Sequence, residues 1–315
     1  MPEEGLEHAV RDEVLTFEEV ATVVRAFARW GVERVRLTGG EPTVRRGLPE
    51  LVAMLADIPL PSGSERARLE VVLTTNGSRL AELAQPLRAA GLAGLTVSVD
   101  SLRADRFAEI TRRGQLSQVL AGLEAARDVG FTGIKINTVA VRGFNSDELG
   151  ELALWAWERG HVPRFIELMP MAGGRLFVPG ELLPAQEIRA AVAAAAGGAL
   201  VADGGAGVAG LGPATYWRVA GGPHAGRKLG VIAAMTENFC AGCNRLRISA
   251  SGRLHNCLAR DDTGDLRSVL RRSGPADPDA LETRVRLLLG HKQSGHGFTL
   301  DGRGGPEKPM IGIGG

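Results

Sequence analysis

The chain has 315 residues with a formal net charge of +1, and apolar residues make up 44% of it. These values are typical of a soluble globular protein, and the near-neutral charge provides no bulk field that would attract nucleic acid or an anionic membrane surface. No apolar run reaches the roughly eighteen residues of a membrane-spanning helix. The acidic start, MPEEGLEHAVRDE, lacks the basic and apolar regions of a signal peptide. We therefore expect a cytoplasmic protein without a membrane or nucleic-acid partner.

Apolar periodicity predicts alternating helices and strands over the first two thirds of the chain. The first predicted element is a helix at 16–31, in which Thr16 and Glu19 have the spacing of a capping box. Five strand and helix pairs follow, with strands at 34–42, 69–77, 95–101, 134–141 and 163–171 and helices at 47–58, 79–91, 115–130, 146–160 and 184–196. We expect Pro86 to bend the helix at 79–91 and Ser146 to be the N-cap of the helix at 146–160.

Strict alternation of strands and helices predicts an α/β fold with a parallel sheet and right-handed crossovers. In a parallel barrel, the functional residues lie where each strand runs into its following loop. Polar or ligand-type residues gather at five such places: Gly39, Gly40 and Glu41; Thr74, Thr75 and Asn76; Ser98, Asp100 and Ser101; Lys135 and Asn137; Glu167 and Met169. The series opens on a helix rather than a strand, so we expect the first strand of the barrel to be missing from it.

The composition changes near residue 197, where a glycine-rich stretch, GGALVADGGAGVAGLGPATYWRVAGGPHAG, begins. We expect two domains, a partial barrel at 1–196 and a smaller C-terminal domain at 197–315. The C-terminal domain contains the cysteine segment described next, a predicted helix at 279–289 and a glycine-rich end, PMIGIGG.

All three cysteines of the chain lie in one segment, FCAGCNRLRISASGRLHNC, at 239–257. Cys240 and Cys243 have the C-x₂-C spacing that brings two thiolates to one metal centre, and Cys257 follows a predicted hairpin around Ser251-Gly252. An odd count of clustered thiols in a reducing compartment is more typical of metal binding than of disulfides. Three interpretations are open: a four-iron cluster with one open iron, a zinc site with His255 as fourth ligand, or three buried, inert thiols.

Two arginines between the cysteines favour an anionic ligand near the thiols. Arg245 and Arg247 are two residues apart, so on a strand both side chains face the same side. Guanidinium groups bind the oxygens of a phosphate chain in pairs. The alternative is a solvated strand face with ordinary ion pairs.

Six stretches occur in one order with characteristic separations: LTGGEPTVRRGL, LTTNG, SVDSL, KINTV, IELMPM and CAGCNRLRISASGRLHNCL, with two glycines at the end of the chain. Together they closely resemble the MoaA family, the GTP 3′,8-cyclases of molybdenum cofactor biosynthesis. The resemblance implies a radical S-adenosylmethionine (SAM) enzyme with an incomplete parallel (β/α) TIM-type barrel. It also implies that a first 4Fe–4S cluster, held by a C-x₃-C-x₂-C motif, cleaves SAM to a 5′-deoxyadenosyl radical that takes the 3′ hydrogen of GTP.

The resemblance further implies that the product is 3′,8-cyclo-7,8-dihydro-GTP, which the partner enzyme MoaC converts to cyclic pyranopterin monophosphate. It implies a second 4Fe–4S cluster that is held by Cys240, Cys243 and Cys257 and binds guanine through its open iron, and it allows a homodimer. Matching by motif gives the GTP contacts as Arg36, Thr74, Lys135, Arg245, Leu246 and Arg247 and the SAM contacts as Gly40, Ser98 and Met169. The terminal Gly314-Gly315 would reach into the active site.

One departure from the family pattern concerns the first cluster. The chain contains no C-x₃-C-x₂-C motif, and in the family a stretch like MPEEG, here residues 1–5, directly follows that motif. We therefore expect that the chain lacks the N-terminal segment of the family and that this polypeptide alone cannot generate the radical. The alternative function is a non-catalytic protein that binds GTP or another nucleotide and carries a single iron–sulfur or zinc site.

Overall fold

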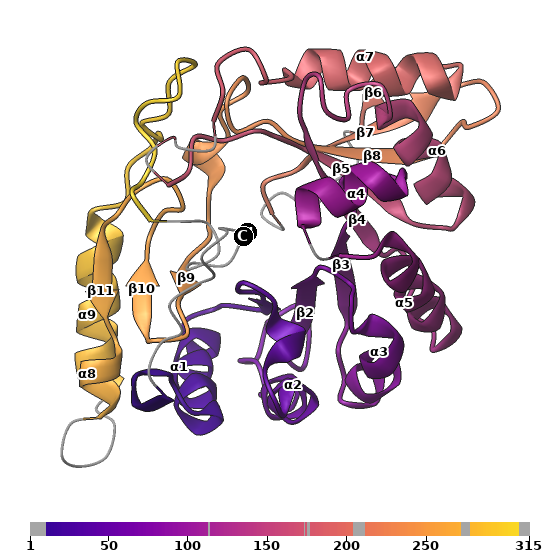
Figure 1. Ribbon diagram of the computed structural model, residues 1–315. Coiled ribbons are helices and arrows are strands. Elements are labelled where there is room, and N and C mark those ends of the chain that lie inside the picture. The colour runs from indigo at the N-terminus through magenta and orange to yellow at the C-terminus, as the bar shows by residue number, and fades with distance from the viewer. Residues whose placement is uncertain are drawn as a thin grey trace.

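The computed structural model describes residues 11–112, 114–172, 174, 177–203, 212–271 and 278–308 (Figure 1). The strands are β1 (Arg34–Leu37), β2 (Glu70–Thr75), β3 (Gly94–Ser98), β4 (Lys135–Ala140), β5 (Val162–Glu167), β6 (Ala199–Ala202), β7 (Thr215–Ala220), β8 (Lys228–Ile232), β9 (Arg247–Ile248), β10 (Arg253–His255) and β11 (Thr263–Asp265). The α-helices are α1 (Phe17–Arg29), α2 (Leu48–Ala56), α3 (Leu80–Ala89), α4 (Ala104–Thr111), α5 (Leu116–Asp128), α6 (Leu149–Glu158), α7 (Ala185–Ala196), α8 (Arg267–Leu270) and α9 (Pro278–Gly290). None of these helices has the length and apolar character needed to cross a bilayer.

Eight strands form one sheet in the order β1-β2-β3-β4-β5-β8-β7-β6. Strands β1 to β5 and β8 run parallel to one another, and β7 and β6 are added antiparallel. The sheet curves with α2, α3 and α5 on its outer side, and its two end strands, β1 and β6, are not paired with each other (Figure 1). The fold is therefore the incomplete α/β barrel that the sequence predicts. Because β8 pairs with β5, the sheet crosses the domain boundary expected at residue 196, and the place of that boundary stays a prediction.

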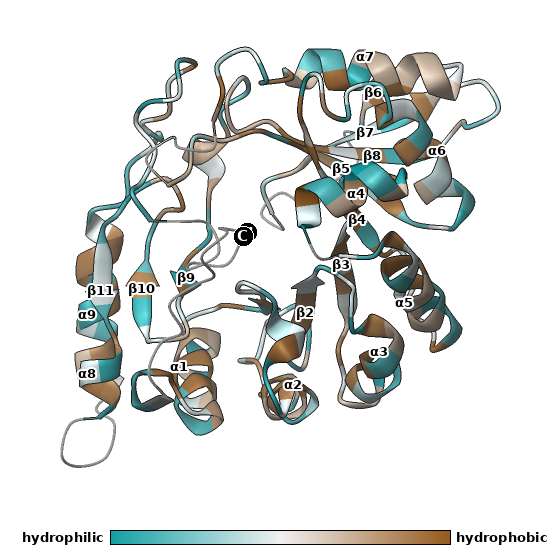
Figure 2. Ribbon diagram, viewed as in Figure 1, coloured by the Kyte–Doolittle hydropathy of each residue, from teal (hydrophilic) through white to brown (hydrophobic). Residues whose placement is uncertain are grey.

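The principal core lies between the sheet and its outer helices, whose apolar sides face the strands (Figure 2). Each parallel strand contributes alternate residues to this core, among them Leu73 of β2, Val97 of β3 and Ile136 of β4, all at most 2% exposed. Since successive strand residues point to opposite faces, the residues between them lie on the inner face of the sheet. The burial of these apolar side chains thus decides which residues can form a site inside the barrel.

Helix α1 packs against two separate cores. Val24 and Ala28 belong to the barrel core, whereas Val23 and Phe27 belong to a second core built from β10, α8 and α9. Figure 1 accordingly shows α1 between the barrel helices and the module formed by β9, β10, β11, α8 and α9. A helix with apolar residues on two sides is buried by two partners. The position of this C-terminal module relative to the barrel therefore depends on α1.

The ends of the elements test the expected local signals. The capping box of α1 is confirmed, because Thr16 Oγ1 accepts from Glu19 N and Glu19 Oε2 accepts from Thr16 N. The hairpin at Ser251-Gly252 is also confirmed, with β9 and β10 antiparallel. The prediction for Ser146 was wrong: α6 begins at Leu149, and Ser146 Oγ instead accepts from Gly143 N at 3.3 Å.

The later start of α6 has a tertiary cause. Glu148, which is fully buried before the first residue of α6, accepts hydrogen bonds from Ser101 Oγ, Leu102 N and Arg106 Nη1. Arg106 belongs to α4, and Ser101 and Leu102 belong to the turn before it. The sequence analysis did not predict α4. A buried carboxylate needs such partners, and they fix the chain just before α6.

Truncation of Phe27 tests the role of α1 as the link between the two cores. Phe27 is 7% exposed within the second core, so we expect Phe27→Ala to lower the free energy of unfolding by about 3–5 kcal/mol. Urea denaturation of the full chain measures this loss. The control is Val44→Ala, at a side chain that is 68% exposed, which should change stability by no more than about 0.5 kcal/mol. Equal midpoints for the two variants would contradict the account of α1.

Candidate active site

The inner face of the parallel sheet carries a continuous set of polar side chains on adjacent strands. Its members are Arg36 of β1, Thr74 of β2, Thr96 of β3, Lys135 and Asn137 of β4, and Arg164 of β5. The strand register places Thr74 beside Thr96, Thr96 beside Lys135, and Asn137 beside Arg164. Three of the six residues expected to bind GTP, Arg36, Thr74 and Lys135, therefore lie together in this set.

Arg36 is held in place by two hydroxyl groups. Its Nη1 donates to Thr74 Oγ1 and to Thr96 Oγ1, each at 3.0 Å. Burial, with the positive charges of Arg164 and Arg34 nearby, lowers the pKa of Arg36 to about 10. The guanidinium is thus oriented by neutral hydroxyls and not by a carboxylate, although the charge of Glu70 acts against the lowering of its pKa.

Lys135 lies beside these guanidiniums on β4. Burial, followed by the charges of Arg164 and Arg36, lowers the pKa of Lys135 to about 8. The same causes act on any ammonium that is withdrawn from water near other cations. Lys135 is therefore partly neutral in mildly alkaline solution until an anion arrives.

Arg164 is a member of this set that the sequence analysis did not single out. It is 7% exposed, and its Nε and Nη2 donate to Asn137 Oδ1 at 2.9 and 2.6 Å. Burial lowers the pKa of Arg164, while the neighbouring Tyr216 hydroxyl partly offsets this shift. Gly230 leaves room for the side chain, since a Cβ there would lie 2.7 Å from Arg164 Cγ. The sequence did contain a signal for Arg164. It is a charged residue at a position of the predicted strand whose side chain faces the inside of the barrel.

The acids near this set have other partners. Among the described residues, no carboxylate forms an ion pair with Arg36, Lys135 or Arg164, and the closest acid along the strands, Glu70, is bonded to Arg34 and lies 3.6 Å from Arg66. One buried and two half-buried cations without an ion-paired acid are costly in the free protein. An anionic ligand that binds there removes this cost, so the inner face is suited to phosphate groups.

The residues expected to bind SAM lie at the carboxyl ends of strands. Gly40 follows β1, Ser98 is the last residue of β3, and Met169 follows β5. These places share one edge of the sheet, but no hydrogen bond among the described residues links one of the three to another. Their joint role stays a prediction. Gly314-Gly315 lies outside the described residues.

Glu41 fixes the loop after β1 to the end of β2. Its carboxylate accepts from Thr43 N at 3.0 Å, Thr75 Oγ1 at 2.7 Å and Asn76 N at 2.6 Å. These bonds hold the glycine loop, which includes Gly40, against the neighbouring strand end. Hydrogen bonds to side chains therefore fix the turns at this part of the carboxyl edge of the sheet.

The cysteine segment forms a second polar region, in the C-terminal module. Cys240 begins a short 3-10 turn in which Cys243 N donates to Cys240 O at 3.0 Å, and Cys240 N donates to Asn238 Oδ1 at 2.7 Å. All three cysteines are free and half-buried. Burial raises the pKa of Cys240, and the neighbouring thiols of Cys257 and Cys243 raise it further. The three thiols therefore lie close enough to influence one another.

Three cations adjoin the thiols: Arg245, Arg247 and Lys292. Burial lowers the pKa of Arg247 to about 10, and the nearby charge of Arg245 adds to this, whereas Cys243 and Cys257 act in the opposite direction. The ammonium of Lys292 lies 3.6 Å from Cys243 Sγ. Positive charges beside thiols favour the thiolate form, which is the form that binds metals.

The donor set can be compared with the two metal sites that the sequence allows. Among the described residues, no three Cys, His, Asp or Glu side chains surround one point as ligands of a single ion. His255, the fourth ligand of the zinc interpretation, is 4% exposed, and its Nδ1 lies 3.0 Å from Lys308 Nζ. In an iron–sulfur cluster the thiolates bind different iron atoms. Three neighbouring thiols with adjoining cations fit such a cluster.

The remaining residues of the expected GTP site have distinct positions. The Arg245 guanidinium lies over the Phe239 ring, 5.3 Å from its centroid. The side chain of Leu246 packs against the second core. The Phe239 ring thus helps to hold Arg245 beside the cysteines. Because the Leu246 side chain is packed in the core, only the backbone of Leu246 could contact a ligand.

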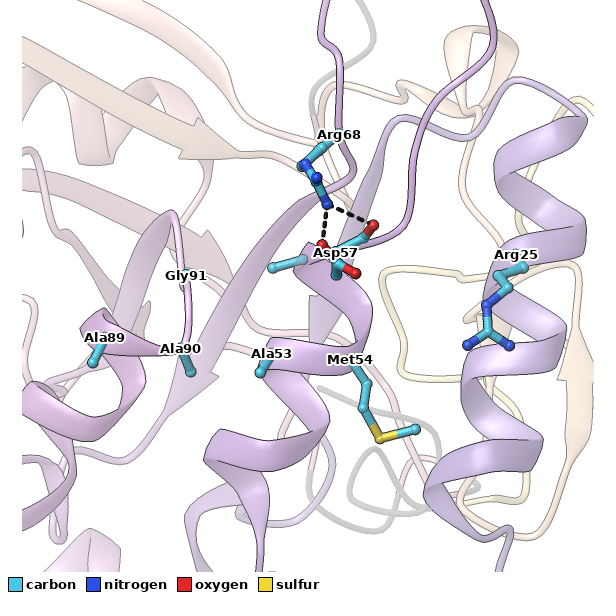
Figure 3. A pocket seen from close by; sticks show the side chains of 9 residues that line it. Arg25, Ala53, Met54, Asp57, Arg68, Ala89, Ala90 and Gly91 are labelled. Atoms are coloured by element: carbon cyan, nitrogen blue, oxygen red, sulfur yellow. Dashed lines mark hydrogen bonds and ion pairs between the residues drawn. The ribbon is translucent and has the colours of Figure 1, made fainter.

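A groove of about 620 Å³ lies on the outer side of the barrel, away from these residues (Figure 3). Arg25, Met54, Asp57, Arg68 and Gly91 are among the residues that line it, and Arg68 bonds Asp57 there. The groove adjoins the carboxyl ends of α2 and α3, which in a strand–helix–strand unit lie next to the amino ends of the strands. It is therefore at the opposite edge of the sheet from the candidate active site.

Comparison with known proteins agrees with this arrangement. Residues 7–156 match the radical SAM superfamily, and residues 162–298 match the family described as Molybdenum Cofactor Synthesis C. A GTP 3′,8-cyclase of Pelotomaculum thermopropionicum is 44% identical over 271 residues, covering 86% of this chain and 79% of that protein. The chain belongs to the GTP 3′,8-cyclase family. Cyclases of a Mycobacterium species and of Pseudomonas putida are each 40% identical, over 100% and 95% of this chain and 86% and 85% of their own lengths.

Membership of the cyclase family confirms the resemblance read from the six sequence stretches. It confirms the radical SAM fold class and implies SAM and a 4Fe–4S cluster as the cofactors of the family. The individual ligands of cluster, SAM and GTP stay predictions for this cyclase-family chain. The structure adds the inner-face set, in which Arg164 is bonded to Asn137 and Arg36 to Thr74.

Removal of Glu167 tests how the carboxyl edge of the sheet is held together. Glu167 is fully buried and accepts from Ala185 N at 2.8 Å, Met235 N at 2.7 Å and Thr236 N at 3.0 Å. Glu167→Ala leaves one buried and two partly buried donors without their acceptor, so we expect a loss of about 2 kcal/mol or more of unfolding free energy, measured by urea denaturation. Glu187→Ala, in the same region but half-exposed, is the control and should cost less than about 1 kcal/mol. A loss for Glu167→Ala as small as for the control would disprove this role.

Proposed function

We propose that this chain functions in a GTP 3′,8-cyclase, a radical SAM lyase that converts GTP to 3′,8-cyclo-7,8-dihydro-GTP in the first step of molybdenum cofactor biosynthesis, and that the radical step requires the C-x₃-C-x₂-C cysteines of the family, which residues 1–315 do not contain. The observation that carries this proposal is a group of three cations, half-buried Arg36 and Lys135 and buried Arg164, without an ion-paired acid among the described residues, in a chain 44% identical to a cyclase. MoaC, which uses the product, is the proposed downstream enzyme.

The inner-face cations are proposed to hold the triphosphate of GTP. The Arg36 and Arg164 guanidiniums are already oriented by Thr74, Thr96 and Asn137, so little side-chain freedom is lost when phosphate oxygens bind. Lys135 lies beside them and supplies a third positive charge. A low-dielectric site with fixed donors binds a polyanion strongly because the donors need no reorganisation.

The carboxyl edge of the sheet is proposed to hold SAM through Gly40, Ser98 and Met169. Gly40 offers bare backbone, which lets a polar ligand approach closely, and Ser98 can donate a hydrogen bond to a ribose or carboxylate. When bound, the SAM-associated 4Fe–4S cluster of the family supplies the electron that cleaves SAM. All three cysteines of this chain belong to the other region and are not assigned to that cluster.

Cys240, Cys243 and Cys257 are proposed to hold a second 4Fe–4S cluster, to which guanine binds. Three thiolates leave one position open for a substrate atom. Arg245 and Arg247 adjoin these thiols and would hold oxygens of the same nucleotide. The two polar regions would then bind opposite ends of one GTP molecule.

Replacement of Arg36 tests the triphosphate site. Arg36→Met removes a charged donor, which costs about 1.5–3 kcal/mol, so we expect the affinity of the anaerobically isolated chain for GTP to fall about tenfold or more. Affinity for guanosine should change little, because guanosine carries no phosphate. Equilibrium binding of both compounds measures the difference.

The matched control for Arg36→Met is Arg25→Met. Arg25 is an exposed arginine that lines the outer groove of Figure 3, so its removal changes net charge equally without touching the inner face. GTP affinity of Arg25→Met should equal that of the unaltered chain. If both variants bind GTP alike, the triphosphate does not bind at Arg36.

The pKa of Lys135 predicts that GTP binding takes up a proton. In the free protein this pKa is about 8, and a bound triphosphate raises it, so at pH 8 about half a proton is taken up on binding. Affinity for GTP therefore falls as pH rises above 8, where the free protein has a neutral Lys135. Calorimetric titration in two buffers with different ionisation enthalpies measures the uptake.

Lys135→Met is the control for this linkage. The variant lacks the group that titrates. Its enthalpy of GTP binding at pH 8 should therefore no longer depend on the ionisation enthalpy of the buffer. An unaltered buffer dependence in Lys135→Met would assign the proton to another group.

A further inference from the structure

Lys292, which follows α9, makes three contacts in the cysteine region. Its Nζ donates to Arg245 O at 2.8 Å and to Asn256 O at 3.1 Å, and it lies 3.6 Å from Cys243 Sγ. An ammonium has three N–H donors, so all three are used. The ammonium of this half-buried lysine is therefore held in one geometry by protein groups and does not depend on solvent for its hydrogen bonds.

The two carbonyls belong to different cysteine-bearing segments. Arg245 lies two residues after Cys243, in the loop that also carries Cys240, whereas Asn256 directly precedes Cys257. A single side chain therefore joins the loop that carries two of the thiols to the strand end that carries the third. No sequence signal in the C-x₂-C motif indicates this partner, since Lys292 is 49 residues from Cys243.

A second bond attaches the same region to α9. Asn256 is fully buried, and its Nδ2 donates to Leu288 O at 3.1 Å near the end of that helix. Leu288 itself belongs to the second core. The end of α9 is thus anchored by packing and can serve as a fixed support for Lys292.

We propose that Lys292 is a positioning residue that holds the three cysteines in a preformed arrangement and donates a hydrogen bond to Cys243 Sγ. The proposed nature of the bound group, an iron–sulfur cluster, rests on the proposed function. The positioning itself rests on the three contacts alone. Groups that orient metal ligands from outside the coordination shell commonly affect metal affinity about 10- to 100-fold.

The proposal makes two kinds of change measurable in the 315-residue chain. Without the lysine, the two cysteine segments are joined only through the β9–β10 hairpin, so a cluster is assembled less completely and lost faster. A hydrogen bond to a cluster sulfur and a nearby positive charge also influence the reduction potential. Loss of the ammonium is expected to make the cluster harder to reduce.

The experiment compares Lys292→Met with Lys292→Arg and with Arg286→Met after anaerobic reconstitution with iron and sulfide. Arg286 is an exposed arginine of α9 whose partner is Glu282, so Arg286→Met removes a charge from the same helix without touching the cysteines. We expect Lys292→Met to lose iron to a chelator about tenfold faster than the unaltered chain, with a lower reduction potential. Lys292→Arg should recover part of both, and Arg286→Met should match the unaltered chain.

Hydrogen exchange of the metal-free chain provides a readout that needs no cluster. Backbone amides at 240–257 should exchange faster in Lys292→Met than in the unaltered chain, while those of the barrel strands should be unchanged. Unchanged barrel exchange also shows that the variant is folded. Should Lys292→Met fail that check, Lys292→Gln, which keeps two N–H donors, replaces it.

The outcomes separate this inference from the proposed function. If the unaltered chain binds zinc or no metal, but exchange at 240–257 rises in Lys292→Met, the cluster assignment fails and the positioning role stands. If iron loss, potential and exchange in Lys292→Met all equal those of Arg286→Met, the positioning role is overturned and the cyclase proposal is unaffected.

Discussion

The alternation of side chains along the parallel strands is the constraint on which both core and candidate site depend. Leu73, Val97 and Ile136 are buried against the helices, and this fixes which way every neighbouring residue points. A slip of one residue in β2 would place Thr74 in the apolar core and Leu73 on the inner face. The hydrophobic effect acting on one face of the sheet therefore positions the polar groups on the other. The hydroxyls that orient Arg36 are placed by core packing rather than by interactions of their own.

The inner face shows why such a site is a compromise between stability and function. Burial lowers the pKa values of Arg36, Lys135 and Arg164, the charge of Arg164 lowers those of Arg36 and Lys135 further, and none of the three has an ion-paired acid among the described residues. Each cation is partly withdrawn from water, which opposes folding. Neutral acceptors such as Asn137 Oδ1 satisfy hydrogen bonds without neutralising charge. A carboxylate in their place would stabilise the free protein but would compete with an incoming phosphate. The arrangement keeps its positive charge for a ligand.

Local sequence patterns predicted the order of strands and helices, the capping box at Thr16 and the hairpin at Ser251-Gly252, because each depends on residues close in sequence. Features that depend on distant partners were missed or wrong. Ser146 has the side chain of an N-cap, yet the buried contacts of Glu148 with Ser101 and Arg106 decide where α6 begins. Arg164 lies within a correctly predicted strand, but its role emerges only when Asn137 and Tyr216 are brought beside it. The order of six stretches identified the family, whereas the contacts of Lys292 required the fold.

The cysteine region depends on helix packing more than on its own loop. Leu281, Val285 and Leu288 of α9 pack with Val23 and Phe27 of α1, and the other side of α1 packs on the barrel. The residue that joins the cysteine segments, Lys292, follows directly from this anchored helix. A loop that holds a metal group cannot keep accurate geometry by its own hydrogen bonds alone, since few of its groups are buried. Because α9 packs on α1, the helix that is shared between the two cores, Lys292 connects the thiols to the rigid barrel. Helix α1 contains no functional side chain of the candidate site. The geometry of the site nevertheless depends on it through this packing.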